Sequence, residues 1–308
     1  MPLVTFENQR RGTRGKRGTS SSEFASDDEV AHVITCNDHD TLLMITQNGI
    51  AYGLRAYQVP TGSRTAKGSA IPSVLPITAD QVVTAVLPVS EFTRNEYIVL
   101  ATEQGWIKRT PLDAFEKTTS RGLIIASLEN GDKLKWCHKC TDDDNILMGT
   151  SRGMATRFGA ANLRPTGRTS RGVRAMKLKE GDTIADMNIL QGAKSGNEEF
   201  VLCITSNGFG KRVPTSEFRA TARGGVGVIA IKFKKQKDRD EDKLSCFCVV
   251  QQDDEILLNT AKGVMVRQQV AQISSQSRSA TGVVVQKVDG GDEITSVNVV
   301  PKDEELQP

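Results

Sequence analysis

The sequence predicts an all-β fold in which four-stranded units repeat as the blades of a propeller-like ring. An apolar run followed by T-x-x-G recurs about every 50 residues, and the five motifs end at Gly49, Gly105, Gly153, Gly208 and Gly263. No long stretch shows the 3.6-residue apolar period of a helix. A four-strand repeat of this length favours propeller blades, and a solenoid of β-units is the alternative.

Each unit begins with two strands that are joined by a tight turn. The apolar run is the first strand, as in "LLMITQNG" ending at Gly49 and "VLCITSNG" ending at Gly208. Asn-Gly and Arg-Gly pairs between β-prone runs favour hairpin turns, because glycine tolerates a positive φ. The β-prone residues that follow each glycine form the second strand.

A long basic loop, a third strand, an acidic turn and a fourth strand complete each unit. The expected loop glycines are Gly68, Gly122, Gly172, Gly224 and Gly282. The acidic positions that follow them are Asp80, Asp132, Asp182, Asp242 and Asp292. Runs such as "TIADMNIL", which come after these acidic turns, alternate as half-buried strands do.

The first unit lacks its opening half. Gly18 and Asp28 keep the spacing of the later loop glycines and acidic turns, but no T-x-x-G strand precedes them. We therefore expect either a fragment of a longer protein or a ring that borrows a C-terminal strand, for which residues 294–301 are suited. The sequence predicts one domain over residues 1–308, with approximate repeats at 1–36 (partial), 37–90, 91–140, 141–192, 193–250 and 251–301 and a short acidic tail at 302–308.

Positive charge gathers at equivalent positions of the repeats, although the formal net charge is only +3. Bases on the second strands are Arg55, Lys108, Arg109, Arg157, Lys211, Arg212 and Arg267. The long loops contribute Lys67, Arg121, Arg171 and Arg223, among others. A basic belt of this kind suits bent duplex DNA, because phosphate contacts do not depend on base sequence. For any single base, a solvated surface position is the alternative.

The loop of the first unit carries a denser basic segment, and its register makes it a blade loop rather than a loose tail. Glycines between arginines let a backbone approach phosphates, and guanidinium groups bind phosphate in a bidentate manner. The predicted DNA contacts here are Gln9, Arg10, Arg11, Gly12, Arg14, Gly15, Lys16 and Arg17. No aromatic residue is interleaved with the basic residues, so stacking on DNA bases is not expected.

This loop and the repeats resemble a known family. The run "QRRGTRG" at residues 9–15 is similar to the QRRGGKG box in the C-terminal domain of the DNA gyrase A subunit, with Thr13 in place of a glycine and Arg14 in place of a lysine. The resemblance implies a six-bladed β-pinwheel that wraps double-stranded DNA around a basic rim and supports ATP-dependent negative supercoiling. It implies as partners the N-terminal part of the gyrase A subunit, together with the gyrase B subunit, in an A2B2 holoenzyme. The isolated domain is then expected to be a monomer.

We expect no catalytic site, cofactor or metal in this chain itself, because ATP and Mg²⁺ of such a holoenzyme bind elsewhere. None of Tyr52, Tyr57 and Tyr97 lies in a cleavage motif, and the chain has no P-loop. "CHKC" at residues 137–140 and "CFC" at residues 246–248 leave structural zinc as an alternative. Both lie on an expected fourth strand, where small buried residues explain them as well.

Two other functions remain open from the sequence. The related polypeptide of topoisomerase IV has a similar domain, but its box is degenerate. A β-propeller scaffold that binds proteins would present an apolar or aromatic face, whereas aromatic residues make up only 5% of this chain.

No apolar run approaches the length of a membrane span. We expect a bacterial cytoplasm, near the nucleoid, or alternatively a chloroplast or mitochondrion.

Overall fold

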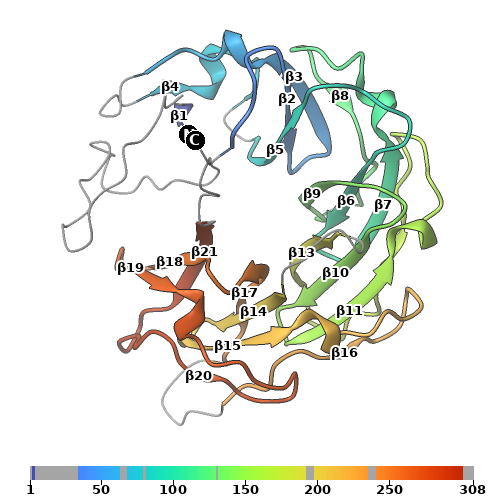
Figure 1. Cartoon of the computed structure of the whole chain (residues 1–308). Helices are drawn as coiled ribbons and strands as arrows, with labels where there is room; N and C mark the ends of the chain where they lie inside the picture. The colour runs from blue at the N-terminus through green and yellow to red at the C-terminus, as the bar shows by residue number, and fades with distance from the viewer. Residues whose placement is uncertain are drawn as a thin grey trace, which may run out of the picture. The chain divides into compact units, whose positions relative to one another are not determined.

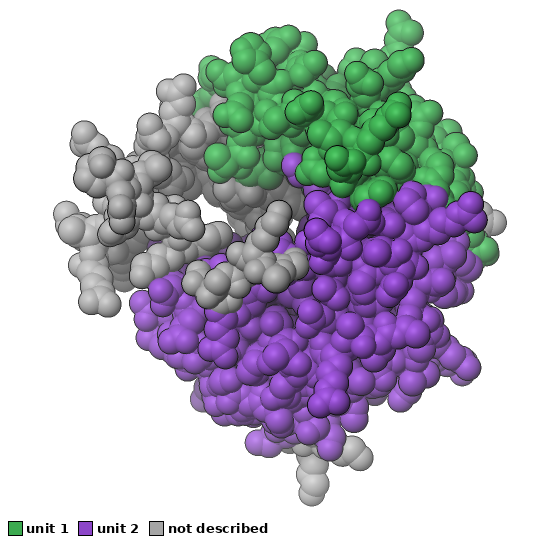
Figure 2. Space-filling model, turned by 45° about the vertical axis from the view of Figure 1, so that its right-hand side comes forward, with its two compact units in different colours: residues 1–98, 110–137, 166–171 green, residues 99–109, 138–165, 172–308 purple. Residues whose placement is uncertain are grey.

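The computed structural model describes residues 2–3, 34–62, 68–78, 81–129, 131–191, 198–234 and 241–300. Two compact units, coloured separately in Figure 2, comprise residues 1–98, 110–137 and 166–171 and residues 99–109, 138–165 and 172–308. Regular structure in the described residues consists of strands and short 3-10 helices, which confirms the all-β prediction. None of the helices in these ranges is long and apolar enough to cross a membrane.

The strands form antiparallel sheets of similar design (Figure 1). In the first unit, one sheet has the order β5 (Val83–Val89), β2 (Thr41–Thr46), β3 (Ile50–Arg55) and β8 (Leu123–Ile124). A two-stranded sheet there pairs β1 (Pro2–Leu3) with β4 (Ser69–Ala70). A further sheet, whose residues belong partly to each unit, has the order β12 (Val173–Arg174), β7 (Trp106–Pro111), β6 (Tyr97–Thr102) and β9 (Leu134–Cys140).

The second unit holds three more sheets. One has the order β13 (Ile184–Leu190), β10 (Asn145–Thr150), β11 (Met154–Gly159) and β16 (Val228–Ile229). The next has the order β17 (Leu244–Gln251), β14 (Glu199–Thr205), β15 (Phe209–Pro214) and β20 (Val283–Val284). The last contains β19 (Met265–Gln269), β18 (Glu255–Thr260) and β21 (Ile294–Val300). The 3-10 helices are η1 (Ala56–Gln58), η2 (Ile71–Ser73), η3 (Leu112–Phe115), η4 (Ala160–Asn162), η5 (Thr215–Glu217) and η6 (Val270–Gln272).

The T-x-x-G motif makes the predicted hairpin turn, and its threonine has a role of its own. All five glycines have a positive φ, between 76° and 82° at Gly49, Gly105, Gly153 and Gly263 and 85° at Gly208. In four turns the threonine Oγ1 accepts a hydrogen bond from the N–H four residues later, as Thr205 does from Phe209 at 3.3 Å. The side chain thereby satisfies a backbone donor that the turn leaves without a ladder partner.

The third, short strand of a sequence repeat pairs with a strand of the preceding repeat rather than with a strand of its own repeat. Residues of β8 pair with β3, with Ala51 opposite Leu123. In the same way β16 pairs with β11 and β20 with β15. A blade is therefore not a contiguous four-strand repeat: its short outer strand is supplied by the next repeat in the chain. An apolar pattern predicts a strand, but it does not specify the strand's partner.

One loop glycine differs from its predicted position. The residue directly before β4, β8, β12, β16 and β20 is a glycine with positive φ. In the fifth sequence repeat this residue is Gly227, not the expected Gly224. A Cβ on Gly227 would lie 2.4 Å from the carbonyl oxygen of Ala155, so only glycine fits this close approach. Gly224 also has a positive φ, but a Cβ there would meet open space.

The core lies on both faces of the central strands. Every residue of β2 is buried, because side chains cover the strand from either side. In the second unit, Cys203 and Phe247 belong to one apolar cluster, whereas Ile204 and Cys246 belong to another. Neighbouring residues of one strand thus enter different clusters, as the alternation of a strand requires. These two-sided strands read as continuous apolar runs in the sequence.

The sheet of β18, β19 and β21 has three strands among the described residues. Val264 and Met265 occupy the positions that the short strand covers in the four-stranded sheets, and they are 47% and 62% exposed. Among the described residues, the edge of β19 therefore leaves large apolar side chains open at these positions.

Candidate nucleic-acid interface

Nine of the predicted DNA contacts lie outside the described residues. They are Gln9, Arg10, Arg11, Gly12, Arg14, Gly15, Lys16, Arg17 and Lys67. The basic box itself is therefore not part of the geometry below, which concerns the bases of the later repeats.

The side chain of Lys211 on β15 is buried and holds a neighbouring loop by hydrogen bonds. Its side chain is fully buried, and its Nζ donates hydrogen bonds to the carbonyl oxygens of Ser277 at 2.7 Å, of Ala280 at 3.0 Å and of Arg278. Burial lowers the pKa of Lys211 to about 8, with smaller opposing contributions from Cys203 and Glu217. This lysine was predicted to face DNA, but its ammonium group binds the long loop of the next repeat.

Two further strand bases are buried as well. Arg109 donates from Nε to the carbonyl oxygen of Leu163 and from Nη1 to the carboxylate of Asp142. Lys108 is only 3% exposed, and burial lowers its pKa to about 8. Because these groups lie inside the protein, Lys108 and Arg109, like Lys211, are not part of the surface that we propose for DNA.

The remaining strand bases are partly or fully exposed. Arg157 donates to the carbonyl oxygens of Thr215 at 3.3 Å and Phe218 at 3.2 Å, and burial lowers its pKa. The half-buried Arg212 guanidinium lies 4.8 Å from the centre of the Phe200 ring. Exposed members of this set are Arg55, which donates to the His39 carbonyl, and Arg267, which pairs with Glu255.

The loop bases lie at the surface. Arg121 and Arg223 are exposed, and Arg171 is half-exposed and forms an ion pair with Glu129 at 2.5 Å. Arg223 donates from Nη1 to the carbonyl oxygen of Arg174 at 2.8 Å. The loop predictions thus fall on side chains that an external ligand can reach, in contrast to the three buried strand bases.

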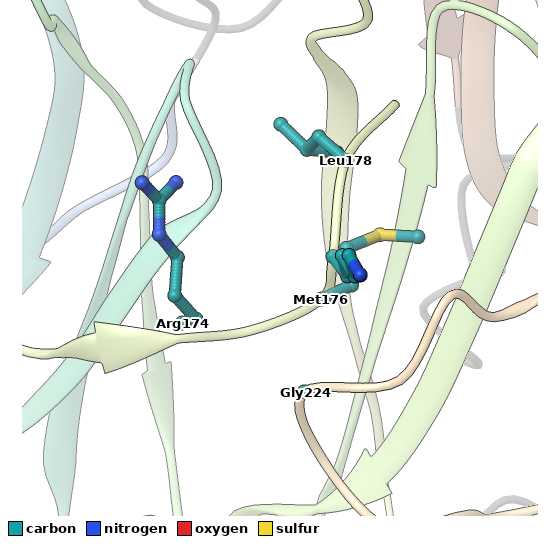
Figure 3. A pocket seen from close by; sticks show the side chains of 5 residues that line it. Arg174, Met176, Leu178 and Gly224 are labelled. Atoms are coloured by element: carbon teal, nitrogen blue, oxygen red, sulfur yellow. The ribbon is translucent and has the colours of Figure 1, made fainter. Parts of the chain in front are cut away.

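A hollow of about 400 Å³ lies among these loops in the second unit. It is lined by Arg174, Met176, Lys177, Leu178 and Gly224. In Figure 3 the Arg174 side chain stands on one side of the hollow, and Met176 and Leu178 stand on the other. Arg174 and Lys177 are exposed, whereas Met176 is buried.

Arg174 is ordered by an aromatic contact that the sequence did not reveal. Its guanidinium carbon lies 4.2 Å from the centre of the Trp106 ring, and its Nη1 donates to the carbonyl oxygen of Gln104 at 2.6 Å. The expectation about stacking on DNA bases concerned the basic box, and this contact within the chain does not test it. The two residues meet because β12 pairs with β7, which places Arg174 opposite Trp106.

Two of the long loops are bound to the preceding short strand in the same manner. Arg223 binds the carbonyl of the last residue of β12, and Arg278 binds the carbonyl of the last residue of β16, Ile229, at 3.2 Å. Backbone bonds run beside these contacts, from Lys177 N–H to Gly225 at 2.8 Å and from Lys232 N–H to Ala280 at 3.3 Å. Arg223 and Arg278 therefore occupy equivalent places on a common backbone arrangement.

The cysteines near the acidic turns form no larger ligand set in the described ranges. No group of three or more His, Cys, Asp and Glu side chains in those ranges is placed to hold a metal ion. Cys137 and Cys140 are both buried, and burial raises the pKa of the Cys140 thiol to about 12.

Comparison with known proteins gives consistent matches. The family model described as "DNA gyrase C-terminal domain, beta-propeller" matches residues 1–37, 40–90, 96–141, 144–191, 199–245 and 254–301. The chain is 40% identical to the DNA gyrase A subunit of Synechocystis, over 98% of this chain and 38% of that protein. It is 33% identical to the chloroplastic/mitochondrial DNA gyrase A subunit of Arabidopsis thaliana, over 97% of this chain and 33% of that protein.

Two solved structures are similar in fold. A DNA gyrase A C-terminal domain aligns with a TM-score of 0.69 and 26% identity, over 90% of each chain. The C-terminal domain of a DNA topoisomerase IV aligns with a TM-score of 0.77 and 25% identity, over 85% of this chain and 80% of that one. The chain spans about a third of the length of the curated relatives that it matches. It belongs to the DNA gyrase C-terminal domain family, whose fold is an all-β propeller.

Proposed function

We propose that this chain binds and wraps double-stranded DNA without regard to base sequence, as the C-terminal domain of a DNA gyrase A subunit. The observation that carries the proposal is the surface formed by Arg174, Lys177 and Arg223 beside the open hollow. Family membership supports the same function, since the chain is similar to gyrase A subunits over nearly its whole length.

The Arg174 guanidinium is preorganised to bind a phosphate group. Stacking on Trp106 and one hydrogen bond to Gln104 fix the guanidinium, so less side-chain entropy is lost when a ligand binds. A guanidinium has five N–H donors, and the bond to Gln104 uses one of them. The exposed Lys177 adds a second cation on the wall of the hollow.

Arg174 ends the short strand β12, and Lys177 and Arg223 lie on loops. Bases on the longer strands hold neighbouring segments of the backbone in place. Lys211 binds three carbonyls of one long loop, and Arg157 binds two carbonyls around η5. Phosphate contacts fix the register of a protein on DNA but carry no sequence information. Loop bases on a common frame suit binding to any sequence, and the predicted box at residues 9–15 would extend this surface.

We further propose that the chain acts within a gyrase holoenzyme. Its partners are then the N-terminal part of the gyrase A subunit, together with the gyrase B subunit, in an A2B2 assembly. That assembly would act in a bacterial cytoplasm or in a chloroplast or mitochondrion. ATP and Mg²⁺ bind elsewhere in that assembly, and the chain's own part is to hold DNA in a wrap. We assign no catalytic residue to this chain.

A linking-number assay tests the proposal directly. The chain is mixed with relaxed closed-circular DNA at low salt, a nicking-closing enzyme is added, and the topoisomers are separated by electrophoresis. Wrapping shifts the linking number in proportion to bound protein, and added salt weakens the shift because counterions compete for phosphates. The absence of any shift at low salt would overturn the proposal.

Substitutions locate the surface. We expect Arg174→Ala, Lys177→Ala and Arg223→Ala each to lower affinity on all sequences and to reduce the salt slope by about 1. The control is Arg94→Ala, because Arg94 is exposed and pairs with Asp113 in another loop. An equal loss in the control would show that any surface base acts in the same way, and would remove the specific role of the hollow.

The box is tested by the combined replacement of Arg10, Arg11 and Arg14 by alanine. If the box directs the wrap, the linking-number shift disappears while binding in a filter or gel-shift assay is weakened much less. Proportional loss of both signals would make the box an ordinary phosphate contact.

A further inference from the structure

Two thiols lie side by side on an edge strand. Cys246 and Cys248 are two residues apart on β17, so their side chains share one face, and their Sγ atoms are 3.3 Å apart. Strand β17 lies at one edge of its sheet, in the order β17-β14-β15-β20. Cys248 is partly exposed and Cys246 is 6% exposed, so a small reagent reaches the pair through Cys248.

The surroundings of Cys246 disfavour thiolate chemistry. Cys246 packs in the apolar cluster with Leu202 and Ile204, and Cys248 lies against the margin of that cluster. The hydrogen bond with Cys248 and burial raise the pKa of the Cys246 thiol well above its usual range. Alkylation and zinc binding both require a deprotonated sulfur, so we expect neither to be efficient at Cys246.

The spacing disfavours a disulfide as well. Residues two apart on a strand have Cα atoms about 6.6–6.8 Å apart, at the upper end of the disulfide range. The sulfurs would also have to move from 3.3 Å to about 2.05 Å. A single atom bridging both sulfurs needs no such movement: with bonds of about 2.3 Å, a separation of 3.3 Å corresponds to an angle of about 92° at the bridging atom.

We propose that Cys246 and Cys248 form a two-thiol binding site for trivalent arsenicals. A pyramidal trivalent arsenic makes bonds near a right angle and needs only two sulfurs when it carries one organic group. In water an organic arsenoxide is hydrated to the dihydroxide R–As(OH)₂. In its reaction with the pair, two As–O bonds and two S–H bonds break, two As–S bonds and two O–H bonds form, and two water molecules leave. No electron is transferred and no net proton is released, so neutral thiols suffice.

The experiment uses the full chain and phenylarsine oxide, with intact-protein mass spectrometry as the readout. We expect one phenylarsenic group per chain, retained on dilution and removed by a dithiol but not by a monothiol. Cys246→Ser and Cys248→Ser should each weaken retention by about 100-fold or more, because bidentate binding is lost. Cys36→Ser, which removes an exposed single thiol, and Cys203→Ser should retain the adduct.

Thermal unfolding of each free variant distinguishes loss of the site from loss of the fold. A folded Cys248→Ser chain that no longer retains the reagent supports the proposal, and so does unfolding at higher temperature of the wild-type chain once loaded. The proposal is overturned if the wild-type chain takes up no stable adduct, if either folded serine variant keeps it, or if Cys36→Ser abolishes it.

Discussion

Replacing Lys211 by methionine isolates the contribution of one buried cation. Methionine keeps most of the unbranched apolar stem but removes the ammonium group. The three carbonyl oxygens of Ser277, Arg278 and Ala280 then lose their donor. Because those carbonyls belong to the long loop of the next repeat, we expect the loop to loosen and the fold to become less stable.

The magnitude follows from two opposing effects. A hydrogen bond from a charged donor contributes about 1.5–3 kcal/mol, so three contribute roughly 4.5–9 kcal/mol. Burial acts in the other direction, since it lowers the pKa of Lys211 to about 8 from an ordinary 10.5, which corresponds to about 3.4 kcal/mol. The difference is roughly 1–6 kcal/mol, and we expect a loss of about 3 kcal/mol in the free energy of unfolding.

Urea denaturation of the full chain, followed by circular dichroism, measures this loss. The control is Lys232→Met, because Lys232 is exposed in the loop after β16 and should change stability by less than about 0.5 kcal/mol. If Lys211→Met also lies within about 0.5 kcal/mol of the wild-type chain, then the three hydrogen bonds do not stabilise the fold and this explanation is wrong.

Three more results are expected. In thermal melts, Gly227→Ala should lower the free energy of unfolding by about 2–4 kcal/mol and Gly224→Ala by only about 1 kcal/mol. The reason is that a Cβ on Gly227, but not one on Gly224, meets the Ala155 carbonyl. Equal losses in the two variants would contradict this reasoning. Thr205→Val should cost about 1 kcal/mol in urea titrations, as the turn loses its side-chain acceptor. Because Lys108 has its pKa lowered to about 8 when folded, the unfolded chain binds more protons between about pH 8 and 10.5, and stability should rise with pH there, less so in Lys108→Met.

The strands and turns were predictable because they depend on local pattern. T-x-x-G motifs ended the first strands as expected, and their glycines have the positive φ that the turn needs. Family and fold class followed from the repeats together with the seven-residue box, and both are confirmed. The period of the repeat could be recognised because equivalent positions of the repeats are buried in the same way and carry the same few residue types.

What the sequence did not contain was the partner of each short strand. Trp106 and Arg174 lie far apart in the chain, and only the pairing of β7 with β12 brings them together. Burial of Lys211 has the same origin, because the loop that covers it comes from the following repeat. A base on a strand next to a turn looks exposed until the covering loop is known. The choice between Gly224 and Gly227 likewise required the neighbouring strand.

Backward pairing of the short strands also decides where this chain can be divided. A fragment that ended after Gln251 would lose Val283 and Val284, which complete the sheet of β17, β14 and β15, together with the carbonyls that Lys211 binds. Its last sheet would then present the bare edge of β15 at Phe209 and Gly210. Shortened chains for expression should therefore end after a short strand rather than at a repeat border. Duplication or deletion of one repeat would disturb two blades at once, because each repeat contributes strands to two sheets.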